Sequence, residues 1–215
     1  MLTKETAHFH SQVSARMLEL SAGLPSPSQQ VVGGLVPSAG QRLRRTLVEA
    51  CAGHTPGAPL PPVVTHFAVR AASIVELLHL ASLLQQEATT EVELLTRVAV
   101  FGLAAKEAAE LGQTVNETVA ATAADLARGE KTGPLFRLAC VLGGQVAGRS
   151  VTDLEVLARF GMELGAAVQL LDDALKLKLA DTRFQRALAQ LDELSDEQAR
   201  ERIVVVARTE WVKLQ

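Results

Sequence analysis

The chain has 215 residues, a formal net charge of −3 and a hydrophobic content of 48%, which suits one globular domain with a sizeable core. The lack of a basic block argues against a nucleic-acid partner, and the aromatic content of 3% argues against a β-rich fold. The two cysteines, Cys51 and Cys140, belong to no metal-ligand spacing, so we expect reduced, buried thiols.

The N-terminal segment has no basic region followed by an apolar stretch and a cleavage site, so we expect no signal peptide and a cytoplasmic location. The most apolar stretch, residues 63–84, is interrupted by His66, Arg70 and Glu76. A buried helix therefore explains this stretch better than a membrane span.

Helical periodicity covers most of the chain, and convincing strand alternation is lacking. Proline- and glycine-containing segments at 23–37 and 55–62 predict loops. Gly53 predicts the end of one helix, and Ser150 predicts the N-cap of another. The pattern indicates an all-α bundle that forms a single domain over residues 1–215, with predicted helices at 3–22, 38–52, 63–87, 92–111, 115–127, 134–146, 151–177, 182–193 and 196–213.

The most informative stretch lies in the predicted helix from residue 151. Gly161 and Gly165 allow close packing against a neighbouring helix, and Gln169, Asp172 and Asp173 follow. Gln169 and Asp173 are four residues apart and share a helix face. Adjacent carboxylates at the end of an apolar helix are typical of a magnesium site that also uses substrate phosphate oxygens. The alternative is a helix C-terminus whose carboxylates simply enter water.

Residues 160–175 resemble the second aspartate-rich region of the trans-prenyl diphosphate synthases. Three upstream segments resemble other motifs of that family in the right order: the basic motif at 39–44, the lead-in to the first aspartate-rich motif at 76–84, and the Lys-Thr segment at 129–136. The resemblance covers about residues 39–176. It implies an isoprenoid-synthase-like helical bundle in which two aspartate-rich motifs hold magnesium ions on the diphosphate of an allylic substrate.

The resemblance also implies site residues. The expected metal ligands are Asp172 and Asp173, with Glu87 as a weaker one. The expected substrate-binding residues are Arg42, Arg44, Lys131, Thr132 and Gln169. Arg42 and Arg44 can hold a diphosphate by bidentate hydrogen bonds. The alternative for these two is that they are exposed arginines of an amphipathic helix.

The sequence departs from the family pattern at several of these positions. The first aspartate-rich motif falls on residues 86–90, where only Glu87 is anionic. Lys176 occupies the third aspartate position of the second motif, and Gln41 replaces the lysine of the basic motif. A lysine beside a magnesium site opposes metal binding. The chain after Asp181 is short, so we expect abbreviated C-terminal helices at 182–213.

These departures predict a protein that is not an active synthase by itself. The preferred hypothesis is a non-catalytic or regulatory subunit of a heteromeric trans-prenyl diphosphate synthase in isoprenoid biosynthesis, with a catalytic synthase subunit as its partner. The alanine-rich helices at 92–111 and 115–127 would supply the contact surface, unless they are ordinary core helices. The alternatives are a magnesium-dependent prenyltransferase of low activity and an isoprenoid-diphosphate-binding homo-oligomer.

The histidines suggest no other mechanism. His8 and His10 are expected near a frayed terminus, His54 and His66 border the proline-rich loop, and His79 is expected to pack within its helix. No Ser-His-Asp or Cys-His arrangement follows from these positions.

Overall fold

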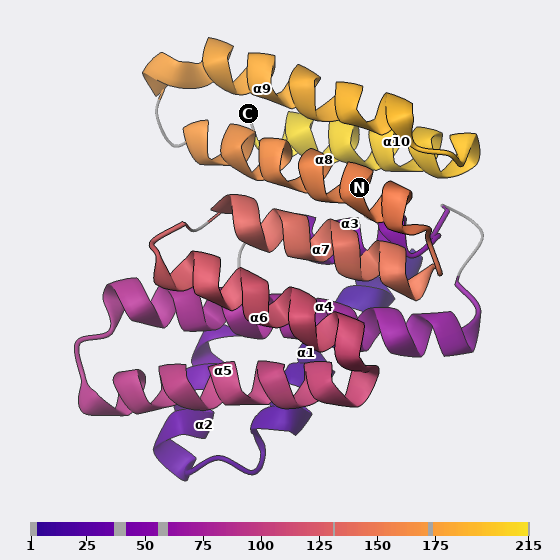
Figure 1. Cartoon of the computed structure of the whole chain (residues 1–215). Coiled ribbons are helices and arrows are strands. Elements are labelled where there is room, and N and C mark those ends of the chain that lie inside the picture. The colour runs from indigo at the N-terminus through magenta and orange to yellow at the C-terminus, as the bar shows by residue number, and fades with distance from the viewer. Residues whose placement is uncertain (1–3, 37–41, 56–59, 131, 172–173, 215) are drawn as a thin grey trace.

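The computed structural model describes residues 4–36, 42–55, 60–130, 132–171 and 174–214. The described residues form α-helices joined by short turns, with no extended strand among them. Figure 1 shows the helices stacked nearly side by side, from α2 and α5 at one end, through α4 and α7, to α8 and α9 at the other. The all-α bundle predicted from the sequence is therefore confirmed. The elements are α1 (Lys4–Ser21), α2 (Ser26–Leu35), α3 (Leu43–Cys51), α4 (Pro62–Glu87), α5 (Glu91–Leu111), α6 (Gln113–Ala127), α7 (Thr132–Val146), α8 (Val151–Leu170), a 3-10 turn η1 (Ala174–Lys176), α9 (Leu177–Gln190), a second turn η2 (Leu191–Glu193) and α10 (Glu197–Leu214).

Helix α4 lies at the centre of the bundle and packs against α1, α3, α5 and α7. It is long and apolar enough to cross a membrane by composition, but 72% of its most apolar window is buried inside the protein. Ile74, Val75, Leu77 and Leu78 are completely buried. A helix surrounded by partners needs apolar residues on every side, which explains its continuous hydrophobicity. The sequence prediction of a buried core helix is confirmed.

The predicted capping residues explain several helix ends. Gly53 has a φ of +114°, and the backbone N–H of His54 reaches back to the carbonyl of Glu49. Glycine adopts this left-handed conformation without steric cost, so α3 ends at Cys51. The hydroxyl of Ser150 accepts the N–H of Asp153 and caps α8, as predicted. Ser195 does not cap the last helix; Asp196 accepts the N–H of Ala199 instead.

The prediction of a loop at 23–37 is wrong for residues 26–35, which form α2. Pro25 precedes this helix and Pro27 lies in its first turn, where proline is tolerated because its missing N–H needs no partner. The side-chain amide of Gln29 also donates to the carbonyls of Ala22 and Leu24, which fixes the turn before the helix.

The predicted helix from residue 151 to 177 is too long, because α8 ends at Leu170. After η1, helix α9 begins at Leu177, earlier than the predicted residue 182. The sequence has no glycine or proline between 171 and 180 to mark the interruption. The second predicted helix also begins later than expected, at Leu43; its predicted first residues at 38–41 lie outside the described part of the chain.

Candidate functional site

Helix α4 ends where the resemblance places the first aspartate-rich motif. Glu87 is exposed, and the side-chain amide of Gln86 donates to the carbonyl of Ser82. Thr90 caps α5 in a reciprocal capping box with Glu93, whose carboxylate accepts the N–H groups of Thr89 and Thr90. Those hydrogen bonds hold the Glu93 carboxylate in the cap and lower its pKa. Glu87 is thus the one carboxylate within residues 86–90, all of which the structure describes.

Helices α7 and α8 approach each other closely, as the small residues predicted. A Cβ atom at Gly161 would lie 2.6 Å from the carbonyl oxygen of Phe136, and one at Gly165 would lie 2.7 Å from the Cα of Gly133. Thr132 at the start of α7 therefore lies against α8, one turn before Gln169, which is exposed. This contact brings the start of α7 beside the last turns of α8, which the sequence analysis did not predict.

Three predicted site residues cannot be placed. Lys131, Asp172 and Asp173 lie outside the described residues. Lys176, which replaces an aspartate of the family motif, is exposed in η1. Within the described part of the chain, no group of three or more histidine, cysteine or acidic side chains could hold a metal ion. Glu87 alone is a poor donor set for magnesium, which needs carboxylates to offset the cost of losing water.

The basic motif does not present two exposed arginines. Arg42 is exposed, but Arg44 is buried and its Nε donates to Glu76 Oε1 at 3.1 Å. Arg45 approaches the other oxygen of Glu76 at 3.5 Å and donates to Ser14. The two resembling segments, 39–44 and 76–84, are therefore joined by a buried ion pair that the sequence analysis did not predict.

This buried cluster carries more positive than negative charge. Arg44 and Arg45 face one carboxylate, and Arg44 Nη2 and Arg45 Nε have no hydrogen-bond partner among the described residues. Burial, followed by the charges of Arg44 and Arg45, lowers the pKa of His79 to about 3, so this histidine stays neutral beside them. The prediction that His79 packs within its helix is consistent with its mostly buried position. His10, expected near a frayed terminus, is instead buried in α1 and lies 3.3 Å from the Thr46 hydroxyl.

A pocket of about 260 Å³ lies beside the C-terminal half of α4 and is bordered by α5 and α6. Ala81 and Leu78 form its α4 wall, Val98 and Phe101 belong to α5, and Arg97 stands at its edge. The lining is mainly apolar, which fits a short hydrocarbon group rather than a polar ligand.

Helix α5 exposes a row of large apolar side chains. Leu94, Leu95, Val98 and Phe101 are 50%, 60%, 67% and 41% exposed. Leu94 and Leu95 lie four and three residues before Val98, and Phe101 lies three residues after it, so the four side chains share one side of the helix. Together with Val92, they form an apolar surface that no described part of this chain covers. We call these five residues the α5 apolar face.

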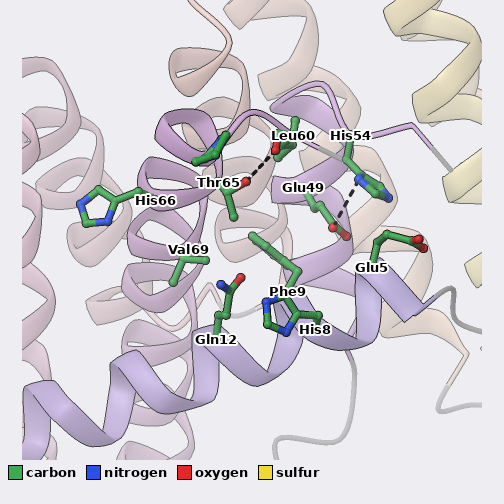
Figure 2. A pocket seen from close by; sticks show the side chains of 11 residues that line it. Glu5, His8, Phe9, Gln12, Glu49, His54, Leu60, Thr65, His66 and Val69 are labelled. Carbon is green, nitrogen blue, oxygen red and sulfur yellow. Dashed lines mark hydrogen bonds and ion pairs between the residues drawn. The ribbon is translucent and has the colours of Figure 1, made fainter. Parts of the chain in front are cut away.

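A further pocket, of about 460 Å³, lies among α1, α3 and the start of α4 and was not predicted. Figure 2 shows Glu5, Glu49 and His54 gathered on one side of it, with His66 on the opposite side. His54 Nδ1 lies 3.6 Å from Glu49 Oε1. The sequence feature that could have indicated this pair is the position of Glu49 and His54 on either side of the turn at Gly53. That turn brings the two residues together.

Comparison with known proteins agrees with this architecture. The polyprenyl synthetase family model matches residues 85–190. A decaprenyl diphosphate synthase from Rhodobacter capsulatus superposes with a TM-score of 0.74 at 20% identity, covering 97% of each chain. A heptaprenyl diphosphate synthase from Staphylococcus aureus gives a TM-score of 0.79 at 12% identity, covering 98% of this chain and 99% of that one. A geranylgeranyl pyrophosphate synthase from Corynebacterium glutamicum, complexed with calcium and isoprenyl diphosphate, gives 0.72 at 18% identity, covering 97% and 96%.

The fold is therefore the isoprenoid-synthase helical fold. The family model and these structures agree with the resemblance of the sequence motifs to the trans-prenyl diphosphate synthases. A search of curated protein sequences found no match. The matched residues begin at the end of α4, so the basic motif at 39–44 and the lead-in at 76–84 lie before them and still rest on the sequence resemblance.

Proposed function

We propose that this chain is a non-catalytic subunit that pairs with a catalytic trans-prenyl diphosphate synthase in the cytoplasm. The observation that carries the proposal is the α5 apolar face. Its five side chains lie on one side of the same helix, whereas isolated exposed apolar residues need no explanation. Burial of such a row by a partner helix would remove apolar area from water and favour association.

The end of α4 supports the non-catalytic part of the proposal. In the related synthases, as the resemblance implies, carboxylates of both aspartate-rich motifs hold magnesium on the leaving diphosphate. Here Gln86 and Thr90 occupy two of those positions, and Glu93 is engaged in capping α5. Asp172 and Asp173 would be the main remaining ligands, with Lys176 three residues further along the chain. Without the carboxylates of the first aspartate-rich motif, the charge of the leaving diphosphate is poorly neutralised.

The apolar cavity beside α4 lies under the α5 apolar face, because Val98 and Phe101 belong to both. A partner docked on α5 would therefore cover this cavity. In this arrangement, the subunit could change the volume available to a growing hydrocarbon chain without catalysing a reaction itself. We infer that it sets product length or activity in the partner.

The direct test is turnover of the purified protein with an allylic diphosphate, isopentenyl diphosphate and magnesium. We expect no release of inorganic diphosphate from this chain alone. We also expect a changed product length when it is added in equal amount to a synthase from the same cells that retains both aspartate-rich motifs. Magnesium-dependent release of diphosphate by the pure protein would contradict the proposal and favour a prenyltransferase of low activity.

A homo-oligomer that binds an isoprenoid diphosphate is the second candidate, and the excess positive charge of the Arg44–Arg45–Glu76 cluster favours it. Arg42 is the exposed arginine of the motif, and Thr132 lies against Gly165, one helical turn before Gln169. Together with Lys131, these residues would hold the diphosphate. Binding of inorganic diphosphate that is lost in Arg42→Ala, by a protein without turnover, would support this function; equal binding by the variant would contradict it.

A further inference from the structure

The end of η1 and the start of α9 expose leucines and lysines in alternation. Leu175, Leu177 and Leu179 are 96%, 44% and 50% exposed, and Lys176 and Lys178 between them are exposed as well. Figure 1 shows α9 at the outer end of the helix stack, on the other side of α8 from α7. A single exposed leucine needs no explanation, but three within five residues form an apolar patch. We call residues 175–179 the Leu–Lys segment.

The packing of α9 leaves this segment at the surface. Ala180, Phe184 and Ala187 are buried and are spaced by three or four residues, so they mark the inner side of the helix. Leu179 and Arg186 are exposed and lie seven residues apart, about two helical turns, so they share a side of α9 that is separate from this buried row. The exposed leucine at the start of the helix is therefore followed by an exposed arginine on the same side.

The charges around the Leu–Lys segment are mostly positive, although the whole chain has a net charge of −3. Residues 174–190 contain four basic side chains and one acidic side chain, Asp181. The carboxylate of Asp181 accepts a hydrogen bond from the indole N–H of Trp211 at 3.1 Å. Asp172 and Asp173 precede the segment and lie outside the described residues; the stretch remains positive when they are counted. Exposed leucines among positive charges are typical of proteins that bind the surface of an anionic membrane.

We propose that the Leu–Lys segment binds the surface of an anionic lipid bilayer. The leucines enter the boundary between headgroups and acyl chains, and the lysines extend their ammonium groups to the lipid phosphates. Arg186 contacts the headgroups further along the helix. The α5 apolar face is less suited to such a surface, because Glu91 and Glu93 lie at its start and anionic lipids repel them. The two surfaces are on different helices, so the inference stands whether or not the chain is a partner subunit.

The test is flotation of the full-length protein with lipid vesicles, in which bound protein rises with the vesicles through a density gradient. One set of vesicles contains equal parts of phosphatidylglycerol and phosphatidylcholine, and the other contains phosphatidylcholine alone. We expect binding to the anionic vesicles to be at least about tenfold stronger and to fall as salt is raised, because salt screens the attraction between basic side chains and lipid phosphates. No binding to the anionic vesicles, or equal binding to both sets, would overturn the proposal.

Two double variants locate the binding segment. Leu175→Glu/Leu179→Glu should weaken binding to the anionic vesicles at least about tenfold, because it removes apolar area and adds negative charge. Val205→Glu/Val212→Glu adds the same charge on α10, at positions that are 58% and 72% exposed, and should change binding less than about twofold. Equal losses in the two variants would show that any added negative charge prevents binding, and would refute the assignment to residues 175–179.

A third variant tests the charges without changing the leucines. Lys178→Gln/Arg186→Gln removes two positive charges from exposed positions, where substitutions have little effect on stability. We expect it to weaken binding to the anionic vesicles roughly fivefold or more. This variant tests the proposal even if the leucine variant folds poorly. Unchanged binding would contradict the role of the basic side chains and overturn the proposal.

Discussion

Arg44 and Glu76 form an ion pair of 3.1 Å in which the two side chains are 5% and 0% exposed. The pair joins α3 to α4 and connects the two sequence segments that resemble the diphosphate-binding motif and the lead-in to the first aspartate-rich motif. Arg45 approaches the second oxygen of Glu76, so one buried carboxylate serves two guanidinium groups. The fold therefore depends on Glu76 more than on any single exposed charge.

Removal of the Glu76 charge should destabilise the protein strongly. In Glu76→Gln, two buried arginines lose their counter-charge, and we expect a loss of about 3–5 kcal/mol in the free energy of unfolding. Urea denaturation followed by circular dichroism measures it. The control is Glu19→Gln, which removes a 69% exposed carboxylate from its pair with Arg16 and should cost less than about 1 kcal/mol. Equal effects of the two changes would contradict the assigned role.

The close contact between α7 and α8 predicts that Gly161 tolerates no side chain. A Cβ there would lie 2.6 Å from backbone atoms of Phe136 and Arg137, which cannot move without displacing α7. We expect Gly161→Ala to lower stability by about 1–3 kcal/mol. Gly102 in α5 offers the matched comparison, because a Cβ there meets nothing within 4 Å. Gly102→Ala should stabilise the helix by about 0.5–1 kcal/mol, and thermal melting of both variants would reveal the opposite signs.

Acid should destabilise the protein through its buried histidines. Burial, followed by nearby positive charges, lowers the pKa of His10 to about 4 and of His79 to about 3. Above pH 6.5, both histidines are neutral in the folded and in the unfolded protein. Below pH 6.5, the unfolded chain binds protons that the folded protein does not bind. The free energy of unfolding therefore falls with decreasing pH until the pKa values of the folded state are reached. Each histidine contributes a slope of up to about 1.4 kcal/mol per pH unit.

Glu49 has the opposite effect on the pH dependence of stability. Its pKa is raised to about 7, so its contribution is present below about pH 4.5 and is lost as the pH rises through 7. Two histidines outweigh one glutamate, so urea denaturation between about pH 7 and pH 5 should show stability decreasing with acid. His79→Gln should flatten that dependence and Glu49→Gln should steepen it. A flat profile for the unmodified protein would refute this account.

Much of the fold was predictable because local signals and the hydrophobic pattern agree. Gly53 and Ser150 mark helix ends by backbone chemistry that does not depend on distant contacts. The central position of α4 follows from apolar residues around its whole circumference. The motif order indicated the same family as the model that matches residues 85–190, because each motif lies within a few residues.

The sequence could not show which charged residues are buried together. From the sequence alone, Arg44 is expected to be an exposed arginine of an amphipathic helix. In the structure it pairs with Glu76, which is 32 residues away in the sequence. The same applies to the Glu49–His54 pocket, whose walls come from α1, α3 and α4. No glycine or proline marks the interruption after α8, and the prolines at the start of the helix at 26–35 favour a loop when only the sequence is considered. Such features depend on tertiary packing rather than on local preference.

The α5 apolar face is the docking surface that the proposed partner subunit would bind. The most direct test is affinity purification of the tagged protein from its native cells, followed by mass spectrometry of the co-purifying chains. The same purification is done in parallel with the double variant Leu95→Glu/Val98→Glu and with the control variant Val212→Glu. Leu95 and Val98 are 60% and 67% exposed, and Val212, on α10, is 72% exposed, so all three changes should leave the fold intact. The account predicts equimolar recovery of a synthase with both aspartate-rich motifs, lost in the α5 variant and retained in Val212→Glu. Recovery of this chain alone, or of the same partner from all three proteins, would contradict it.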